Sequence, residues 1–437
     1  MASMLPHLQS ALGILVILTV AWIFSEKRNA FPWRIVLVGL ALQAGIALLL
    51  LKVEVARDAL FGLNGVVGVL TDATRAGTGF VYGFLGGGPS PFPASIVDPH
   101  ALSTFAFGIL PLVIIISALS AILWYWRILP LIVGAMAFVL RRTLGIGGAV
   151  GLGAAATVFL GNIEGSLVVR PYLAKITRTE LFILMTTGLA VVAGTVFVVY
   201  ANMLAHVLPG ALGHILVASM MSLPGAIIVA CIMVPGDAVT DVSQVDEAHK
   251  YQSTMDAMAR GTEDGLKIYL QIIAMLIVTT ALVAIVNTML AGLQYGAWYL
   301  LDAKMHLGIA FPAQPLTLQE ILGWLFAPLV WLYGVPWNEA VQAGSLLGIK
   351  TILNEFIAYS QLAVLPPGTL DPRSTQIMVY ALCGFANFAS VGILIAGFGT
   401  LIPERRAEIV PLAMRAIVSG TMASGLTACM IGLLPVT

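Results

Sequence analysis

The sequence predicts an all-α polytopic membrane protein with about eight transmembrane helices, two re-entrant hairpins and an interfacial helix. Composition carries this prediction, because 59% of the 437 residues are hydrophobic, only 10% are charged and the mean hydropathy is +0.98. Soluble domains carry about 25% charged residues. The expected partners are therefore the lipid bilayer and a small solute. With 21 basic against 21 acidic residues, the chain offers no basic surface for nucleic acid.

The transmembrane helices are predicted from apolar runs, since crossing the hydrocarbon core takes roughly 17 to 25 helical residues. We expect spans at residues 10–24, 32–52, 105–125, 180–206, 211–234, 267–292, 376–401 and 408–434. The first run lacks the basic leader and the cleavage site of a signal peptide, so it is expected to be retained. The stretch VEVARDALFGLNGVVGVLTDATRAG keeps an apolar stripe at helical spacing between its charges. That pattern predicts a helix lying along the membrane interface.

The connections predict the orientation. The Gly/Pro-rich residues 76–100 and the charged residues 235–264 are expected to be loops, neither large enough for a soluble domain. The first loop, SEKRNAFPWR, carries three basic residues against Glu26, so the positive-inside rule places it in the cytoplasm. We therefore expect a multi-pass protein of a bacterial inner membrane with both termini in the periplasm.

Two segments, residues 145–176 and 317–363, differ from ordinary spans. The first holds Asn162 and Glu164 between two glycines, and the second holds Glu355 after a break at a glycine and a proline. Irregular backbone at membrane depth is tolerated only where it lines protein or a watery cavity. Each segment therefore predicts a re-entrant hairpin.

Each hairpin is followed by a span with a Gly-rich centre, GLAVVAGTV at 188–196 and GFANFASVG at 384–392. The same order in both halves is typical of an internal repeat. Interrupted helices at matching positions of two halves predict a binding site near the bilayer midplane.

Glu164 and Glu355 are the first candidates for function, because a carboxylate at membrane depth costs at least about 2.5 kcal/mol to insert. An alternative is that each is only paired off, Glu164 with Arg170 and Glu355 with Lys350.

Three residues of the second interrupted span, Phe385, Asn387 and Ser390, are further candidates. Polar residues of this kind also join helices, and an aromatic residue also packs, so a structural role stays open for all three.

Three stretches resemble the core signatures of the concentrative nucleoside transporter family. They read GNIEGSLVVRPYLAKITRTELFILMTTGLAVVAGTV, FAPLVWLYGVPWNEAVQAGSLLGIKTILNEFIAY and GFANFASVGI, within a resemblance that runs from about residue 95 to the C-terminus. The resemblance implies a homotrimer in which each protomer transports alone, with an inverted-repeat transport domain on a trimeric scaffold. It assigns residues 1–100 to the scaffold, 101–234 to the first half and 235–437 to the second half.

The resemblance also implies a nucleoside-like solute. Glu355 matches the family glutamate that accepts hydrogen bonds from ribose hydroxyls, and Asn387 and Ser390 match its ribose partners. Phe385 matches an aromatic residue beside the sugar. A vicinal diol suits this set, because its hydroxyls donate to a carboxylate and exchange hydrogen bonds with an amide.

The base side of the site departs from the family pattern. Glu164 and Val196 match, but Asn162 and Ile163 stand where the family has Gln-Thr or Gln-Ser, and Gly165 replaces a proline, which is expected to loosen the hairpin tip. Altered donors predict an altered base preference. The alternative is a symporter of another ribose-containing or sugar-conjugate solute.

The coupling ion is predicted from two further departures. Sodium-coupled members place an asparagine and a Ser or Thr where this chain has Thr157 and Val191. Sodium prefers several hard oxygen ligands, so a proton is favoured over sodium as the coupling ion. Glu164 or Glu355 is the expected proton carrier, with Thr157 beside the ion path.

Other classes fit less well. The sequence has no HExxH or GxSxG motif, so neither an enzyme nor a cofactor or structural metal is expected. A channel is a further alternative, but paired interrupted helices with two acids suit an occluded solute better.

Overall fold

The chain folds into helices and irregular turns throughout the part that the computed structural model describes. That part comprises residues 5–91, 104–236, 240, 251–305 and 314–434. It contains seven helices long and apolar enough to cross a membrane, or eight if the pair α15 and α16, bent by 115°, counts as one. The prediction of an all-α polytopic membrane protein is confirmed.

The first helices form a peripheral group. They are α1 (Leu5–Ile23), α2 (Trp33–Lys52), α3 (Glu54–Tyr82), the short 3₁₀ helix η1 (Gly83–Gly86), α5 (Phe105–Gly108) and α6 (Leu112–Tyr125). The predicted interfacial helix is α3, and it is longer than expected: residues 76–82, predicted as loop, continue the helix. The rest of that predicted loop beyond residue 91 lies outside the described residues.

The first half of the repeat follows. Its helices are α7 (Ile128–Leu144), α8 (Gly148–Leu160), α9 (Glu164–Leu167), α10 (Arg170–Leu173), α11 (Arg178–Ala190), α12 (Gly194–Leu204) and α13 (Ala211–Met233). Here α8 is one arm of the predicted hairpin and α9 with α10 is the other. The span predicted at 180–206 is interrupted between α11 and α12, as its glycines indicated.

The second half has the same order of elements. Its helices are α15 (Leu318–Leu332), α16 (Trp337–Ile352), α17 (Glu355–Ala363), α18 (Pro372–Leu382), α19 (Phe388–Leu401), η2 (Pro403–Arg405) and α20 (Arg406–Gly432). The segment predicted as one hairpin therefore contains three helices. The break at Gly334 and Pro336 separates α15 from α16, and the reversal beside Glu355 lies between α16 and α17.

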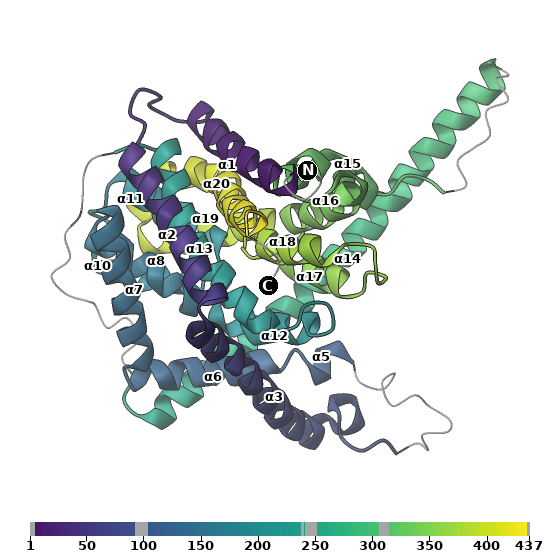
Figure 1. The fold of residues 1–437 in the computed structure, drawn as a ribbon. Helices are drawn as coiled ribbons and strands as arrows, with labels where there is room; N and C mark the ends of the chain where they lie inside the picture. Colours follow the sequence, from purple (N-terminus) through teal and green to yellow (C-terminus); the bar gives the residue numbers. More distant parts are fainter. Residues whose placement is uncertain (1–4, 92–103, 237–239, 241–250, 306–313, 435–437) are drawn as a thin grey trace.

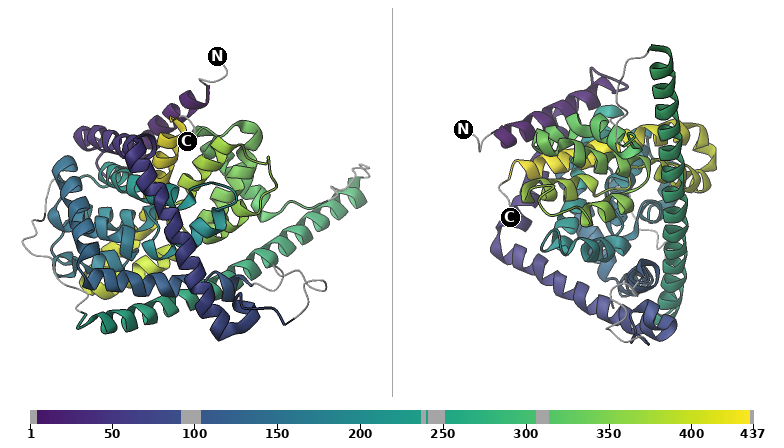
Figure 2. Two further views of the ribbon diagram at one scale, coloured as in Figure 1. Left: turned by 60° about the horizontal axis from the view of Figure 1, so that its bottom comes forward. Right: turned by 90° about the vertical axis from the view of Figure 1, so that its right-hand side faces the viewer.

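The longest helix, α14 (Thr254–Met305), joins the two halves. The span predicted at 267–292 is only its middle, and residues 254–264, predicted as part of a loop, form its first turns. Residues 237–239 and 241–250 of that predicted loop lie outside the described residues. Figure 1 shows α14 extending beyond the helical bundle, and Figure 2 shows α3 and α14 along its outside. Gly261 and Gly265 allow α14 to pack closely against α6.

A charged cluster joins the first loop to both halves. The guanidinium of Arg178, at the start of α11, donates to Glu26 at 2.8 Å, and Arg415 of α20 also donates to Glu26. Hydrogen bonding from Arg178 holds the pKa of Glu26 below its usual range, although partial burial opposes this. The first loop, the start of α11 and the first turns of α20 therefore lie at the same end of the bundle.

Candidate solute-binding site

A cavity of about 300 Å³ lies between the two hairpins, the two interrupted spans and α14. Its polar lining comes from both halves of the repeat. The polar side chains are those of Asn162, Glu164, Thr195, Tyr200, Gln271, Asn354, Glu355, Asn387 and Ser390. The volume is at the lower end of the range for small-molecule sites.

The two interrupted spans meet beside this cavity. If α18 continued, the backbone N–H of Phe385 would donate to the carbonyl of Ala381. It donates instead to the carbonyl of Val191, in the break of the first span, at 3.3 Å. The two breaks are therefore joined by a backbone hydrogen bond, and backbone at membrane depth needs such partners within the protein.

Glu355 is held at the cavity wall by side chains from two other helices. It is the first residue of α17, whose start is capped by Asn354, which accepts a hydrogen bond from the N–H of Ile357 at 2.9 Å. The Tyr200 hydroxyl donates to Glu355 Oε1 at 2.8 Å, and Asn387 Nδ2 donates to Glu355 Oε2 at 3.1 Å. Both carboxylate oxygens therefore have a donor, although the side chain is only 5% exposed.

The second interrupted span supplies the adjacent polar groups. Asn387 caps α19, because its Oδ1 accepts a hydrogen bond from the N–H of Ser390 at 2.8 Å. The cap orients the amide so that Nδ2 faces Glu355. Phe385 and Ser390 line the same cavity. The four residues predicted for the sugar side are therefore brought together.

The first hairpin supplies the opposite wall. Gly161 makes its turn with a φ of +111°, a conformation that only glycine adopts without strain. Asn162 and Glu164 follow and line the cavity. The Asn162 side chain lies against Gly188 of α11, and its Oδ1 is buried without a hydrogen-bond partner among the described residues.

Two predicted site residues do not line the cavity. Ile163 packs instead against α19, where its side chain fills the space beside Gly397. Thr157 is 1% exposed and lies between the arms of the first hairpin, where its hydroxyl donates to the Gly153 carbonyl at 2.8 Å. Gly165 packs directly against the Thr157 backbone, so this glycine allows the hairpin arms to approach closely. The sequence predicted that Gly165 would loosen the hairpin tip, and it did not predict this close contact between the arms.

The structure describes all four residues of the two alternative ion pairs, and neither pair forms. No contact within 4.0 Å joins Glu164 to Arg170 or Glu355 to Lys350. Lys350 has other partners, the carbonyl of Ala381 and the hydroxyl of Ser424.

Sequence reasoning missed Tyr200. The signal that could have found it is its position four residues after Val196 in a mostly apolar helix, which places both side chains on one face. Phe356, next to Glu355, and Gln271 of α14 also line the cavity and were not predicted.

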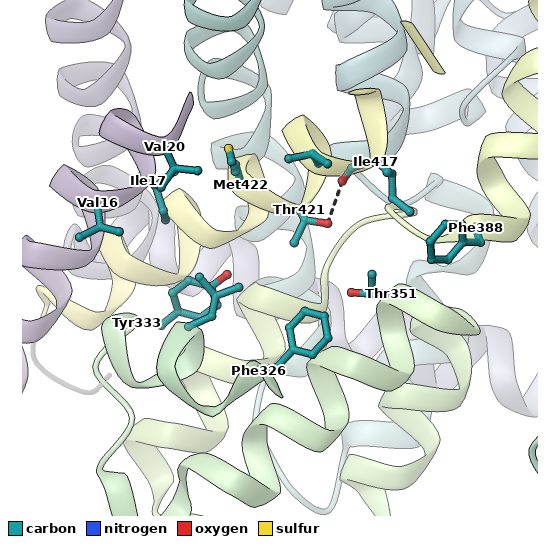
Figure 3. Close-up of a pocket in the computed structure, with 12 residues that line it drawn as sticks. Val16, Ile17, Val20, Phe326, Tyr333, Thr351, Phe388, Ile417, Thr421 and Met422 are labelled. Carbon is teal, nitrogen blue, oxygen red and sulfur yellow. Dashed lines mark hydrogen bonds between the residues drawn. The ribbon is translucent and has the colours of Figure 1, made fainter. Parts of the chain in front are cut away.

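A second, larger cavity of about 380 Å³ lies between α1, α15, α16 and α20 (Figure 3). Its lining is apolar except for three hydroxyl groups. Those of Thr351 and Thr421 already donate to backbone carbonyls of their own helices, at 2.9 and 2.8 Å. This cavity holds no ionisable group except the Tyr333 phenol, so it does not offer the partners that a polar solute needs.

Interrupted helices from two repeated halves around a polar cavity define a secondary transporter. Three family models match the chain: "Na+ dependent nucleoside transporter N-terminus" over residues 12–85, "Nucleoside recognition" over 106–207 and "Na+ dependent nucleoside transporter C-terminus" over 214–432. The chain belongs to the concentrative nucleoside transporter family. Members of this family are transporters, not enzymes.

Two bacterial relatives match over nearly their whole length. An uncharacterized transporter of Bacillus subtilis is 35% identical over 97% of this chain and 98% of its own. The nucleoside permease NupC of Helicobacter pylori is 33% identical over 97% of each chain.

Solved structures match equally well. An inward-facing, substrate-bound structure of CNTnw is similar with a TM-score of 0.86, at 33% identity over 98% of both chains. An outward-facing structure of a variant of the same protein has a TM-score of 0.87, over 98% of this chain and 97% of its own.

Proposed function

We propose that this protein is a symporter that imports nucleosides across a bacterial inner membrane and couples their entry to protons. The observation that carries the proposal is the Glu355 carboxylate, which lines the cavity and is held by Tyr200 and Asn387. A vicinal diol offers two further donors to such an acceptor, and Asn387 and Ser390 lie beside it. The name of the H. pylori relative, nucleoside permease, supports the same solute class.

The coupling ion is proposed from this chain's own residues. Two of the family models carry sodium in their descriptions, and a rat relative, 30% identical, is named sodium/nucleoside cotransporter 1; this chain spans 64% of its length. In this chain the Thr157 hydroxyl donates to the Gly153 carbonyl within α8, and Val191 has no side-chain oxygen. The Val191 carbonyl also accepts the N–H of Phe385. These two positions offer fewer side-chain oxygens than the pattern of the sodium-coupled members, so a proton carried by Glu164 or Glu355 is the better candidate.

The base side is proposed to rest on Asn162 and Glu164. Both residues line the cavity and carry groups that can hydrogen-bond to a base, and Val196 offers an apolar contact. Because Ile163 is turned toward α19, it acts only by fixing the hairpin. The alternative solute, a sugar conjugate without an ordinary base, would leave the polar groups of Asn162 and Glu164 without a base partner.

Purified protein in liposomes tests the proposal directly. We expect saturable uptake of labelled nucleosides, and competition by other nucleosides that exceeds competition by sugar conjugates. Protein-free liposomes are the control. Stronger competition by sugar conjugates would favour the alternative, and unitary currents without saturable uptake would indicate a channel.

Deoxyribosides are expected to compete less well than their parent ribosides. Removing one hydroxyl leaves a buried partner at Glu355 or Asn387 unsatisfied, which costs about 1 to 3 kcal/mol for each lost bond. Competition curves against a labelled riboside measure this difference. Equal competition by both classes would remove the ribose from the Glu355 side of the cavity.

Orientation and assembly are part of the same proposal. The cluster of Glu26, Arg178 and Arg415 gathers basic residues at the end of the first loop, which supports a cytoplasmic location for that end and periplasmic termini. Labelling of a cysteine placed at Ser25 only from the cytoplasmic side would agree, and labelling from outside would reverse the orientation. The homotrimer and the division into scaffold and transport domain remain proposals from the family resemblance, and the mass of the protein in lipid nanodiscs tests the trimer.

A further inference from the structure

Lys350 is a completely buried lysine in the second hairpin, on α16. Its Nζ donates to the carbonyl of Ala381 at 2.8 Å and to the Ser424 hydroxyl of α20 at 2.9 Å. A lysine at membrane depth is costly to insert and requires compensating partners. Both of its partners are neutral, so hydrogen bonding alone leaves the positive charge uncompensated.

The Ala381 carbonyl is available because α18 is interrupted. The N–H of Phe385, which would take this carbonyl in a continuous helix, donates to Val191 instead. The carbonyl groups at a helix C-terminus carry partial negative charge and favour a cation. Lys350 therefore closes the broken end of α18 and ties the hairpin to α18 and α20.

Glu355 lies five residues further along the same hairpin, at the start of α17, and is also buried, with only 5% exposed. No direct ion pair joins the two groups, but opposite charges in a buried, low-dielectric interior attract each other over longer distances than in water. The other groups around Glu355 are Tyr200 of α12, Tyr359 of its own helix, Cys383 in the α18–α19 break and Asn387 at the start of α19. Lys350 is the only cation in this set of described groups.

We propose that Lys350 is a positioning residue of the solute site, whose positive charge keeps Glu355 ionised while its hydrogen bonds fix the interrupted end of α18. The inference rests on the proposed function for its link to ribosides. The inference also decides which of the two acidic residues carries the coupling proton. Glu355 has two hydrogen-bond donors and a compensating cation, whereas Glu164 has neither a side-chain partner nor a nearby cation in the described part of the chain. The coupling proton is therefore assigned to Glu164.

Lys350→Met tests the charge. Without the cation, Glu355 takes up a proton and accepts ribose hydroxyls less well, so riboside affinity falls by about tenfold at neutral pH. Affinity recovers as the pH rises and Glu355 ionises again, whereas wild type lacks this recovery. Lys350→Arg retains the charge and the wild-type pH profile. Lys267→Met, at a lysine that is 65% exposed on α14, is the matched control and leaves affinity unchanged.

A double-variant cycle covers the case in which Lys350→Met folds poorly. Thermal stability without solute is measured for Lys350→Met, Glu355→Gln and the combination. Removing both charges is expected to restore much of the stability that Lys350→Met loses, because the buried carboxylate is no longer uncompensated. Additive losses, or an affinity loss with no pH dependence, would reduce Lys350 to a packing role. This cycle needs no solute, so it tests the charge balance between Lys350 and Glu355 even if ribosides do not bind. A failure of ribosides to bind would instead overturn the proposed function.

Discussion

Replacing Glu355 by glutamine is expected to lower the apparent affinity for ribosides by about 10- to 100-fold. The amide keeps the volume of the side chain but removes the negative charge that strengthens bonds from the ribose hydroxyls. In the wild type, Tyr200 and Asn387 donate to the two carboxylate oxygens of Glu355. The glutamine amide has only one acceptor oxygen, so one of these two donors loses its acceptor. The loss is therefore expected in KM, with the fold retained.

Uptake kinetics at equal membrane expression measure this effect. Glu263→Gln is the matched control, because Glu263 lies on α14 with a side chain that is 66% exposed and forms an ion pair with the neighbouring Lys267. Wild-type uptake by Glu355→Gln would take Glu355 out of the solute site and leave the cavity without its proposed diol acceptor.

Uptake is also expected to follow a proton gradient and to be nearly indifferent to sodium. Protonation of Glu164 on the outer side and release in the cytoplasm would move one charge with the solute. The membrane potential then contributes about 2.3 kcal/mol per charge for each 100 mV. Glu164→Gln removes the exchangeable proton and is expected to abolish accumulation against a gradient.

Proteoliposomes with imposed ion gradients separate the two ions. A protonophore in sodium-free medium should stop accumulation by wild type, while replacement of sodium by choline should have little effect. If choline abolishes uptake and a proton gradient does nothing, a sodium site exists after all. Its ligands would then include oxygens such as that of Thr195, which lines the cavity.

The repeat shows how far local sequence determines this fold. Asn354 and Asn387 were visible as polar residues in apolar runs, and both cap the helix that begins after a break. Capping is a local interaction with the next turn, so it depends on residues that are close in the sequence. The sequence indicated the tip of the second hairpin less clearly. Gly334 and Pro336 indicate a helix break between α15 and α16, but the chain reverses at the tip between α16 and α17.

The side on which a residue faces was the weaker prediction. Thr157 and Ile163 stand at family positions that suggested the ion path and the base, yet one lies between hairpin arms and the other against α19. In a soluble helix, the polar face shows which side is exposed. Helix α8, which carries Thr157, is otherwise apolar and mostly buried, so its sequence marks no such side.

The sequence by itself determined the membrane class, most of the spans, the two interrupted halves and the acids at their centre, because hydropathy and helix breaks are local properties. Only the tertiary structure decided the partners of those acids. Tyr200 and Glu355 are separated by 155 residues, and Lys350 and Ser424 by 74. The physical reason is that lipid and protein interior are equally apolar, so hydropathy places a helix in the membrane without choosing its neighbours. The polar contacts that make the site form only once the two halves have packed together.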